Sequence, residues 1–316
     1  MAGTNQRTAY GETLVELCRE NPDIVVLDAD LGGSTMGKMV EQAMPERHIE
    51  MGIAEANMAS VAGGLSRVGK IPFINSFAVF TAGRAYDQIR QSVAIGNMNV
   101  KICGSSAGCS DFGDGATHQS IDDIAYMRVI PNMTVIVPVD ANETVAATRY
   151  MAEHQGPMYM RLNRNDYENV TEEAQPFQFG EPVVLRDGKE VTVFACGVMV
   201  GKALEAAEAL KDEVSVRVVN VSTIKPLNKE KINEYAKDVK GVVTAEEHSV
   251  IGGLGGAVAE ALCKACKPIE MVGVEDRFGA SAHNYNDILN YLGLTTEHIA
   301  DAVRKISKLN KKNIGE

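Results

Sequence analysis

Short apolar runs rich in β-branched residues recur along this chain, and each is followed by a segment with helical spacing. The runs include IVVLDAD at 24–30, IPFINSF at 71–77, TVIVPV at 134–139 and EVTVFACG at 190–197. Strands this apolar are typical of parallel sheets that are buried on both faces. The alternation therefore predicts an α/β protein whose mostly parallel sheets are covered by helices.

One polar stretch interrupts this rhythm. The segment NRNDYENVTEEAQPFQFGEP at 163–182 contains two prolines and has no apolar periodicity, which is typical of an interdomain linker. A chain of 316 residues is long enough for two domains. We predict an α/β domain at 1–165, a linker at 166–182 and a second α/β domain at 183–316.

Composition excludes several classes of partner. The formal net charge is -11, which disfavours binding to nucleic acid or to an anionic membrane, because both require a basic face. No apolar run approaches the roughly 20 residues of a membrane span. The N-terminal residues lack the apolar core of a signal peptide, so we expect a cytoplasmic protein.

The six cysteines are scattered, as in reduced intracellular proteins. Cys263 and Cys266 form a lone CxxC. Because no second pair of metal-ligand type follows, we expect them to be two small apolar residues on an amphipathic helix rather than a redox or metal site.

Three loops that follow predicted strands are rich in glycine and polar residues. They are LDADLGGST at 27–35, IEMGIAEANMASVAGG at 49–64 and GSSAGCSDFGDGATHQS at 104–120. Open parallel sheets bind their ligands at the carboxyl ends of the strands. These loops are therefore the candidate site.

Two residues in these loops allow alternative interpretations. Glu55 begins an apolar helix. It is either a first-turn carboxylate exposed to water, or a buried carboxyl that apolar surroundings keep protonated and able to exchange a proton. His118, close to Asp114, is either a surface histidine or part of a site.

Four segments, taken together and in order, resemble the C-terminal half of the transketolase family. They are GIAEANMA at 52–59, INSFAVFTAGRAYDQIR at 74–90, GDGATHQSIDDIAYMRVIPNMTVIVPVDANE at 113–143 and MYMRLNR at 158–164. The resemblance runs over nearly the whole chain. It implies a pyrimidine-binding (Pyr) α/β domain followed by a transketolase C-terminal α/β domain.

The resemblance implies thiamine diphosphate as cofactor. Its thiazolium C2 must lose a proton, and a carboxyl bonded to N1′ of the aminopyrimidine drives the tautomer that removes it. Carried over, Glu55 is that catalytic carboxyl, Phe80 stacks on the pyrimidine with Phe77 nearby, and Asp30 resembles a dimer-contact acid close to the cofactor. The segment from Phe80 to Arg84 is one residue longer than in common transketolases.

The same resemblance implies a sugar phosphate site. Asp114 accepts a hydrogen bond from a hydroxyl of the donor sugar, and His118 acts at the oxygens of the donor or intermediate. Arg164 resembles the arginine that holds the phosphate, which suits its bidentate geometry, and Arg7 and Ser34 resemble further phosphate contacts. Ser106 stands where many transketolases carry a histidine.

The family's N-terminal half, which supplies the diphosphate and metal site, has no counterpart in this sequence. That half carries a Gly-Asp-Gly with an asparagine pair further along the chain, and no such pair follows Asp114. We therefore expect no metal ligand here and interpret Asp114 as a hydroxyl reader. Mg²⁺ and the diphosphate are expected on a large partner subunit, in a two-plus-two heterotetramer.

These features predict the small subunit of a split transketolase, which transfers a two-carbon ketol unit between a ketose phosphate and an aldose phosphate, with pentose phosphate sugars as the default. The alternatives are the beta subunit of a 2-oxo acid dehydrogenase, a deoxyxylulose phosphate synthase, and a non-catalytic regulatory α/β subunit. Arg164 favours transketolase because a 2-oxo acid needs no distal phosphate clamp. Glu55 argues against a subunit without catalysis.

Overall fold

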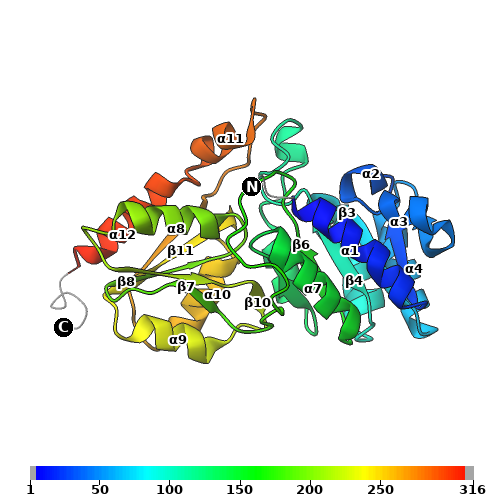
Figure 1. Cartoon of the computed structure of the whole chain (residues 1–316), viewed down its shortest axis with the longest axis horizontal. Coiled ribbons are helices and arrows are strands. Elements are labelled where there is room, and N and C mark those ends of the chain that lie inside the picture. Colours follow the sequence, from blue (N-terminus) through cyan, green and yellow to red (C-terminus); the bar gives the residue numbers. More distant parts are fainter. Residues whose placement is uncertain (1–4, 310–316) are drawn as a thin grey trace.

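The computed structural model describes residues 5–309, which form two α/β domains beside one another (Figure 1). The first domain is built on a seven-stranded sheet in the order β10-β5-β6-β4-β3-β1-β2. The prediction of two mostly parallel α/β domains is confirmed. Strands of this sheet from the first domain are β1 (Ile24–Asp28), β2 (His48–Glu50), β3 (Ile71–Phe77), β4 (Lys101–Ser105), β5 (Thr134–Ile136) and β6 (Met158–Arg161).

Helices cover both faces of this sheet. Alternate strand residues point to opposite faces, so Val25 and Leu27 pack with α4, whereas Ile24 and Val26 pack with α1 and α7. The helices are α1 (Gln6–Glu20), α2 (Gly32–Thr35), α3 (Lys38–Ala43), α4 (Glu55–Arg67), α5 (Tyr86–Gln88), α6 (Asp123–Val129) and α7 (Ala141–Glu153). Shorter turns are the 3-10 helices η1 (Pro45–Arg47) and η4 (Gly115–Thr117) and the π-helices η2 (Val79–Arg84) and η3 (Ile89–Ala94).

The second domain has a five-stranded sheet in the order β12-β11-β8-β9-β7. All of its pairs are parallel except β7 with β9. Its strands are β7 (Val183–Arg186), β8 (Val191–Ala195), β9 (Val216–Asn220), β11 (Gly241–Ser249) and β12 (Ile269–Val274). Its helices are α8 (Met199–Ala209), α9 (Lys229–Lys237), α10 (Leu254–Leu262), α11 (Tyr285–Leu292) and α12 (Thr296–Ser307).

The two domains share structure beyond the connecting segment, which contains no helix or strand between 162 and 182. Strand β10 (Thr223–Lys225) comes from the second half of the chain but pairs antiparallel with β5 of the first sheet. In α7, the partly buried carboxylate of Glu143 accepts hydrogen bonds from Ser222 Oγ at 2.5 Å and Asn220 Nδ2 at 3.1 Å. These hydrogen bonds connect the first domain to the second.

The CxxC lies differently from the prediction. Helix α10 ends at Leu262, Cys263 caps it, and Cys266 follows with a left-handed φ of 49°, so both cysteines are exposed. The expected helix through both is wrong, because the left-handed backbone at Cys266 cannot continue an α-helix. Within residues 5–309 no cluster of three or more metal-ligating side chains occurs, and no helix is long and apolar enough to cross a membrane.

Candidate active site

The sequence-predicted residues gather at one edge of the first sheet, because they follow neighbouring parallel strands. Loops after β1, β3, β4 and β6 carry respectively Ser34, Phe80, His118 and Arg164, and these strands are neighbours in the order β6-β4-β3-β1. Glu55 follows β2, which pairs with β1. Parallel strands end at the same edge, so loops distant in sequence meet there.

Glu55 occupies the first turn of α4 and is only 2% exposed, which excludes the interpretation as a solvent-exposed carboxylate. Its side chain lies on the same buried helix face as Met58 and Ala59. The expectation of purely apolar surroundings is incomplete, however. Arg84 Nη1 donates to both carboxylate oxygens at 3.2 Å, and this arginine was not identified from the sequence.

Phe77 and Phe80 form a stacked pair beside this carboxyl. Their ring centroids lie 6.1 Å apart with an interplanar angle of 11°. The chain between Phe80 and Arg84 forms a π-helix, a wider turn that can take up an extra residue and is frequent at functional sites. This turn returns Arg84 over the Phe80 ring, with its guanidinium carbon 5.0 Å from the centroid. The only sequence signal for Arg84 was its place one turn after Phe80.

His118 packs edge-on against both phenylalanines. Its ring centroid lies 5.4 Å from that of Phe80 and 6.2 Å from that of Phe77, at 80° and 72° respectively. His118 is therefore half-buried against these rings, and its role in the site stays a prediction. Asp114 lies exposed on the same loop just before η4, and among the described residues no hydrogen bond links its carboxylate to the other predicted site residues.

Ser106 directly follows β4, at the edge of the sheet where the predicted residues gather. Its side chain is fully buried, its φ is 51°, and its hydroxyl has no partner among the described groups. The effect of a serine in place of the histidine on sugar recognition stays a prediction.

Two arginines meet at the other side of Phe77. Arg7 Nη2 donates to the backbone oxygen of Arg164 at 3.2 Å, and Arg7 Nη1 donates to the backbone oxygen of Ser34 at 2.8 Å. Burial, and then the positive charge of Arg164, lower the pKa of Arg7 from its ordinary value. The Arg164 guanidinium lies 6.0 Å from the Phe77 centroid and donates to Asp111 Oδ2 at 2.6 Å, a partner that sequence reasoning missed.

Asp30 is exposed in the loop after β1, with a left-handed φ of 57°. Its backbone N–H donates to Glu50 Oε1 at 2.8 Å, which joins this loop to the turn leading to Glu55. Ser34 contacts Arg7 through its backbone oxygen, so a role for its hydroxyl stays a prediction.

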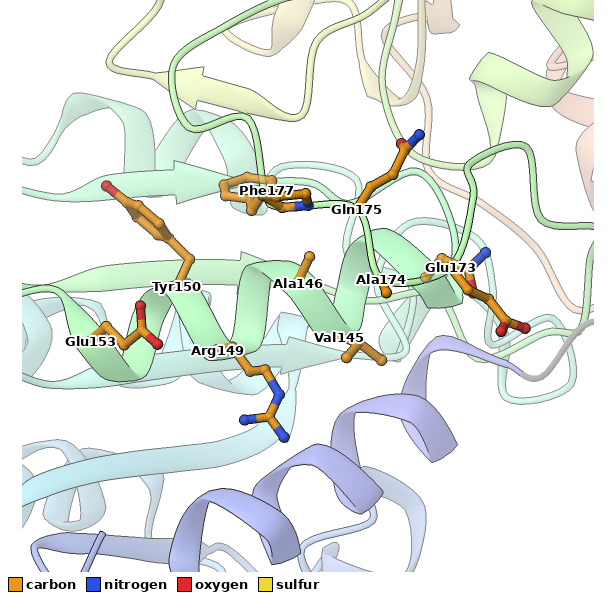
Figure 2. A pocket seen from close by; sticks show the side chains of 11 residues that line it. Val145, Ala146, Arg149, Tyr150, Glu153, Glu173, Ala174, Gln175 and Phe177 are labelled. Atoms are coloured by element: carbon orange, nitrogen blue, oxygen red, sulfur yellow. The ribbon is translucent and has the colours of Figure 1, made fainter. Parts of the chain in front are cut away.

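A separate pocket lies elsewhere in the molecule. It has a volume of about 680 Å³ and lies between α7 and the interdomain segment, lined by Tyr150, Phe177 and neighbouring side chains (Figure 2). Arg149 at its margin points toward α1, where it pairs with Glu16 and Glu20. None of the residues that gather at the sheet edge lines this pocket, so it is separate from the candidate site.

The fold and the sheet-edge residues together define a class: a two-domain α/β chain with a buried carboxyl, a stacked aromatic pair and two arginines at one edge of its first sheet. Residues 3–169 match the transketolase pyrimidine binding domain, and residues 180–299 match the transketolase C-terminal domain. The chain belongs to the transketolase family, as the sequence resemblance predicted.

Known relatives are similar to this chain over nearly all of its length. A protein described as the putative transketolase C-terminal section of Methanocaldococcus jannaschii is 45% identical over 307 residues, covering 96% of each chain. A 6-deoxy-6-sulfo-D-fructose transketolase subunit of Clostridium sp. (strain MSTE9) is 42% identical, covering 96% of this chain and 94% of that protein. A solved structure described as a split gene transketolase, inactive beta4 tetramer, is 48% identical with a TM-score of 0.89, covering 98% of this chain and 100% of that one.

Proposed function

We propose that this chain is the pyrimidine-side subunit of a two-chain transketolase, transferring a two-carbon ketol unit between sugars that end in a phosphate. One observation carries the proposal: contacts run without a break from the carboxyl to the cations. Glu55 pairs with Arg84, Arg84 covers Phe80, and Phe80 stacks with Phe77, which is flanked by His118 and Arg164. The set has an acid at one end, a flat apolar wall in the middle and positive charge at the other end.

The residues present fit the pyrimidine end of thiamine diphosphate. Glu55 would share a proton with ring nitrogen N1′ of the pyrimidine, because its carboxylate has about four acceptor positions and Arg84 occupies two of them by long contacts. Phe80 would hold the flat ring through stacking, with the buried Phe77 behind it. When bound, the cofactor supplies the electron sink that lets a carbon–carbon bond break and form.

The part of the site that would bind the sugar is proposed from its histidine and its positively charged arginines. His118, held edge-on by both rings, would move a proton at a sugar oxygen. Arg7 and Arg164 suit a tetrahedral oxyanion at the far end of the sugar. The relative from Clostridium is named for a sulfo-sugar, and a sulfonate is also such an oxyanion. Pentose phosphate substrates, Asp114 as a hydroxyl reader, Asp30 as a dimer contact and a cytoplasmic two-plus-two heterotetramer stay predictions.

The test of the two-chain proposal is a binding titration. The purified chain should show no Mg²⁺-dependent binding of thiamine diphosphate by calorimetry, because the diphosphate and metal ligands are proposed to lie on a large subunit. After mixing with a subunit that carries a Gly-Asp-Gly and a downstream asparagine pair, binding and ketol transfer from sugar phosphates should appear together. Tight binding by the chain alone would overturn the division into two chains. A complex that binds cofactor but transfers no ketol unit from any sugar phosphate would overturn the activity.

Arg164→Ala should raise the KM for phosphorylated sugars by about 10- to 100-fold, as expected for losing a hydrogen bond to a charged group worth about 1.5–3 kcal/mol. The affinity for thiamine diphosphate and the kcat should change little. Arg186→Ala is the matched control, since Arg186 pairs with Glu208 on the surface of the second domain. Equal losses of sugar and cofactor binding in the Arg164 variant would indicate a folding defect and contradict the phosphate assignment.

A further inference from the structure

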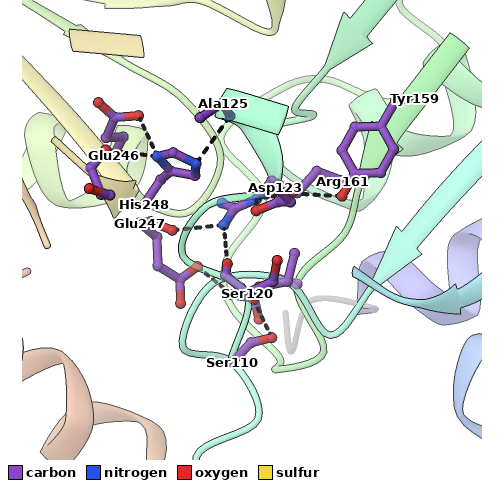
Figure 3. A network of polar contacts seen from close by, with 12 residues as sticks. Ser110, Ser120, Asp123, Ala125, Tyr159, Arg161, Glu246, Glu247 and His248 are labelled. Atoms are coloured by element: carbon purple, nitrogen blue, oxygen red, sulfur yellow. Dashed lines mark hydrogen bonds and ion pairs between the residues drawn. The ribbon is translucent and has the colours of Figure 1, made fainter. Parts of the chain in front are cut away.

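One buried carboxylate of the second domain contacts the first domain. Glu247 lies near the end of β11, is 4% exposed, and points toward the loop that carries Ser110 and Ser120, while the preceding Glu246 points the opposite way toward His248 (Figure 3). This alternation follows from the strand geometry of β11. Of these two adjacent buried glutamates, Glu247 therefore accepts hydrogen bonds from the first domain, and Glu246 accepts them within its own domain.

Glu247 accepts three hydrogen bonds through its carboxylate. Cys109 N–H donates to Oε1 at 2.9 Å, and Asn163 Nδ2 donates to Oε2 at 3.1 Å; both donors belong to the first domain. Tyr285 OH, from the second domain, donates to Oε1 at 2.8 Å and accepts from Asn163 Nδ2 at 2.7 Å. Burial raises the pKa of Glu247, and the nearby Arg161 charge opposes that shift.

The two loops held in this way are those that carry the proposed substrate groups. Cys109 is two residues before Asp111, the carboxylate that binds Arg164, and Asn163 directly precedes Arg164. The two loops are also joined to each other, because Asn165 Nδ2 donates to the backbone oxygen of Ser110 at 3.0 Å. Moving either donor would move the Arg164–Asp111 pair.

Gly108 shows that the loop is shaped to admit this carboxylate. Its φ is +64°, and a Cβ at this position would lie 2.4 Å from Glu247 Cδ and 2.6 Å from Oε2. A residue with a side chain would be both strained and in collision. The close approach of the loop to Glu247 therefore depends on this glycine.

We infer that Glu247 is a positioning residue. Through it, the C-terminal domain holds the 107–111 loop and Arg164 where Arg164 can bind the terminal oxyanion of the sugar. The inference rests on the proposed function for the identity of the ligand. It assigns the second domain a part in substrate affinity, although none of its side chains is placed at the reacting sugar.

Glu247→Gln in the assembled enzyme tests this role. In glutamine, an NH₂ group replaces one of the two carboxylate oxygens. This NH₂ group must face either the Cys109 N–H or Asn163 Nδ2, which are themselves donors, so one hydrogen bond is lost. We expect the KM for a phosphorylated acceptor to rise about tenfold, the effect of one charge-assisted hydrogen bond. The KM for a short unphosphorylated aldehyde, the kcat and the cofactor affinity should stay within about threefold, below the effect of one such bond.

Glu246→Gln is the matched control. Glu246 is equally buried, but its carboxylate accepts from Leu254 N and Gly255 N, both within the second domain. This variant should lose stability without a phosphate-selective change in KM. Tyr285→Phe removes one donor to Glu247 and keeps the charge of the carboxylate. It should raise the KM for the phosphorylated acceptor by less than Glu247→Gln does, and it replaces that variant in the test if Glu247→Gln does not fold.

Hydrogen exchange of the backbone amides gives a readout that is independent of activity. Amides at 107–111 and 163–165 should exchange faster in Glu247→Gln than in Glu246→Gln. If both variants exchange alike, or if phosphorylated and unphosphorylated acceptors lose affinity equally, the positioning role is wrong. Absence of ketol transfer by the wild-type complex would overturn the proposed function alone, because the exchange comparison still decides whether Glu247 holds these loops.

Discussion

Glu55→Gln should lower ketol transfer by the assembled enzyme about 10²- to 10⁴-fold, the range for losing a positioned acid or base. The physical reason is that an amide cannot share a proton with the ring nitrogen of the proposed cofactor. The fold should persist, because Gln has nearly the same shape and keeps an oxygen that accepts from Arg84, the donor now bonded to the carboxylate. Single-turnover and steady-state assays at saturating cofactor would measure the loss.

Glu12→Gln is a suitable control, since Glu12 is exposed on α1 and has no place in the site. Circular dichroism and the thermal midpoint of the Glu55 variant should match those of the wild type. If the Glu55 variant kept activity within a few-fold of wild type while binding cofactor normally, the catalytic assignment of Glu55 would be wrong.

Arg161→Met should lower the free energy of unfolding by about 3–5 kcal/mol, the cost of leaving a buried charge without its partner. Arg161 Nε donates to both oxygens of Asp123, the shorter contact being 2.8 Å, and both side chains are buried. Its Nη2 also donates to the backbone oxygens of Ser120 and Glu247, so the same side chain ties the domains together (Figure 3). Urea denaturation followed by circular dichroism would measure the change.

The same substitution at an exposed site provides the comparison. Arg149 pairs with Glu16 and Glu20, each more than half exposed, so Arg149→Met should cost no more than about 1 kcal/mol. A loss in the Arg161 variant no larger than in the Arg149 variant would contradict the importance of the buried network. Replacing Asp123 as well should recover part of the loss, because it removes the unpaired charge.

Much of the candidate site could be predicted from local sequence because its residues follow apolar strands. The runs that become β3, β4 and β6 mark where the loops begin, and parallel strands bring those loops to one edge. Glu55 and His118 were identified from these loops, whereas Phe80 and Arg164 came only from the resemblance of the ordered motifs to transketolases. The alternatives for Glu55 stayed open, since a first-turn glutamate has the same sequence pattern whether water or a packed guanidinium lies beside it.

The sequence by itself determined the alternation of strands and helices, the two α/β domains and the loops that carry the polar residues, because periodicity and turn chemistry act over a few neighbouring residues. Only the tertiary structure decided which side chains meet. Arg84 lies 29 residues from Glu55, Asp111 lies 53 from Arg164, and Glu247 lies 138 from Cys109. Such pairs form because the packing of both domains brings loops together that are far apart in the sequence. A local sequence pattern does not show which of these loops become neighbours.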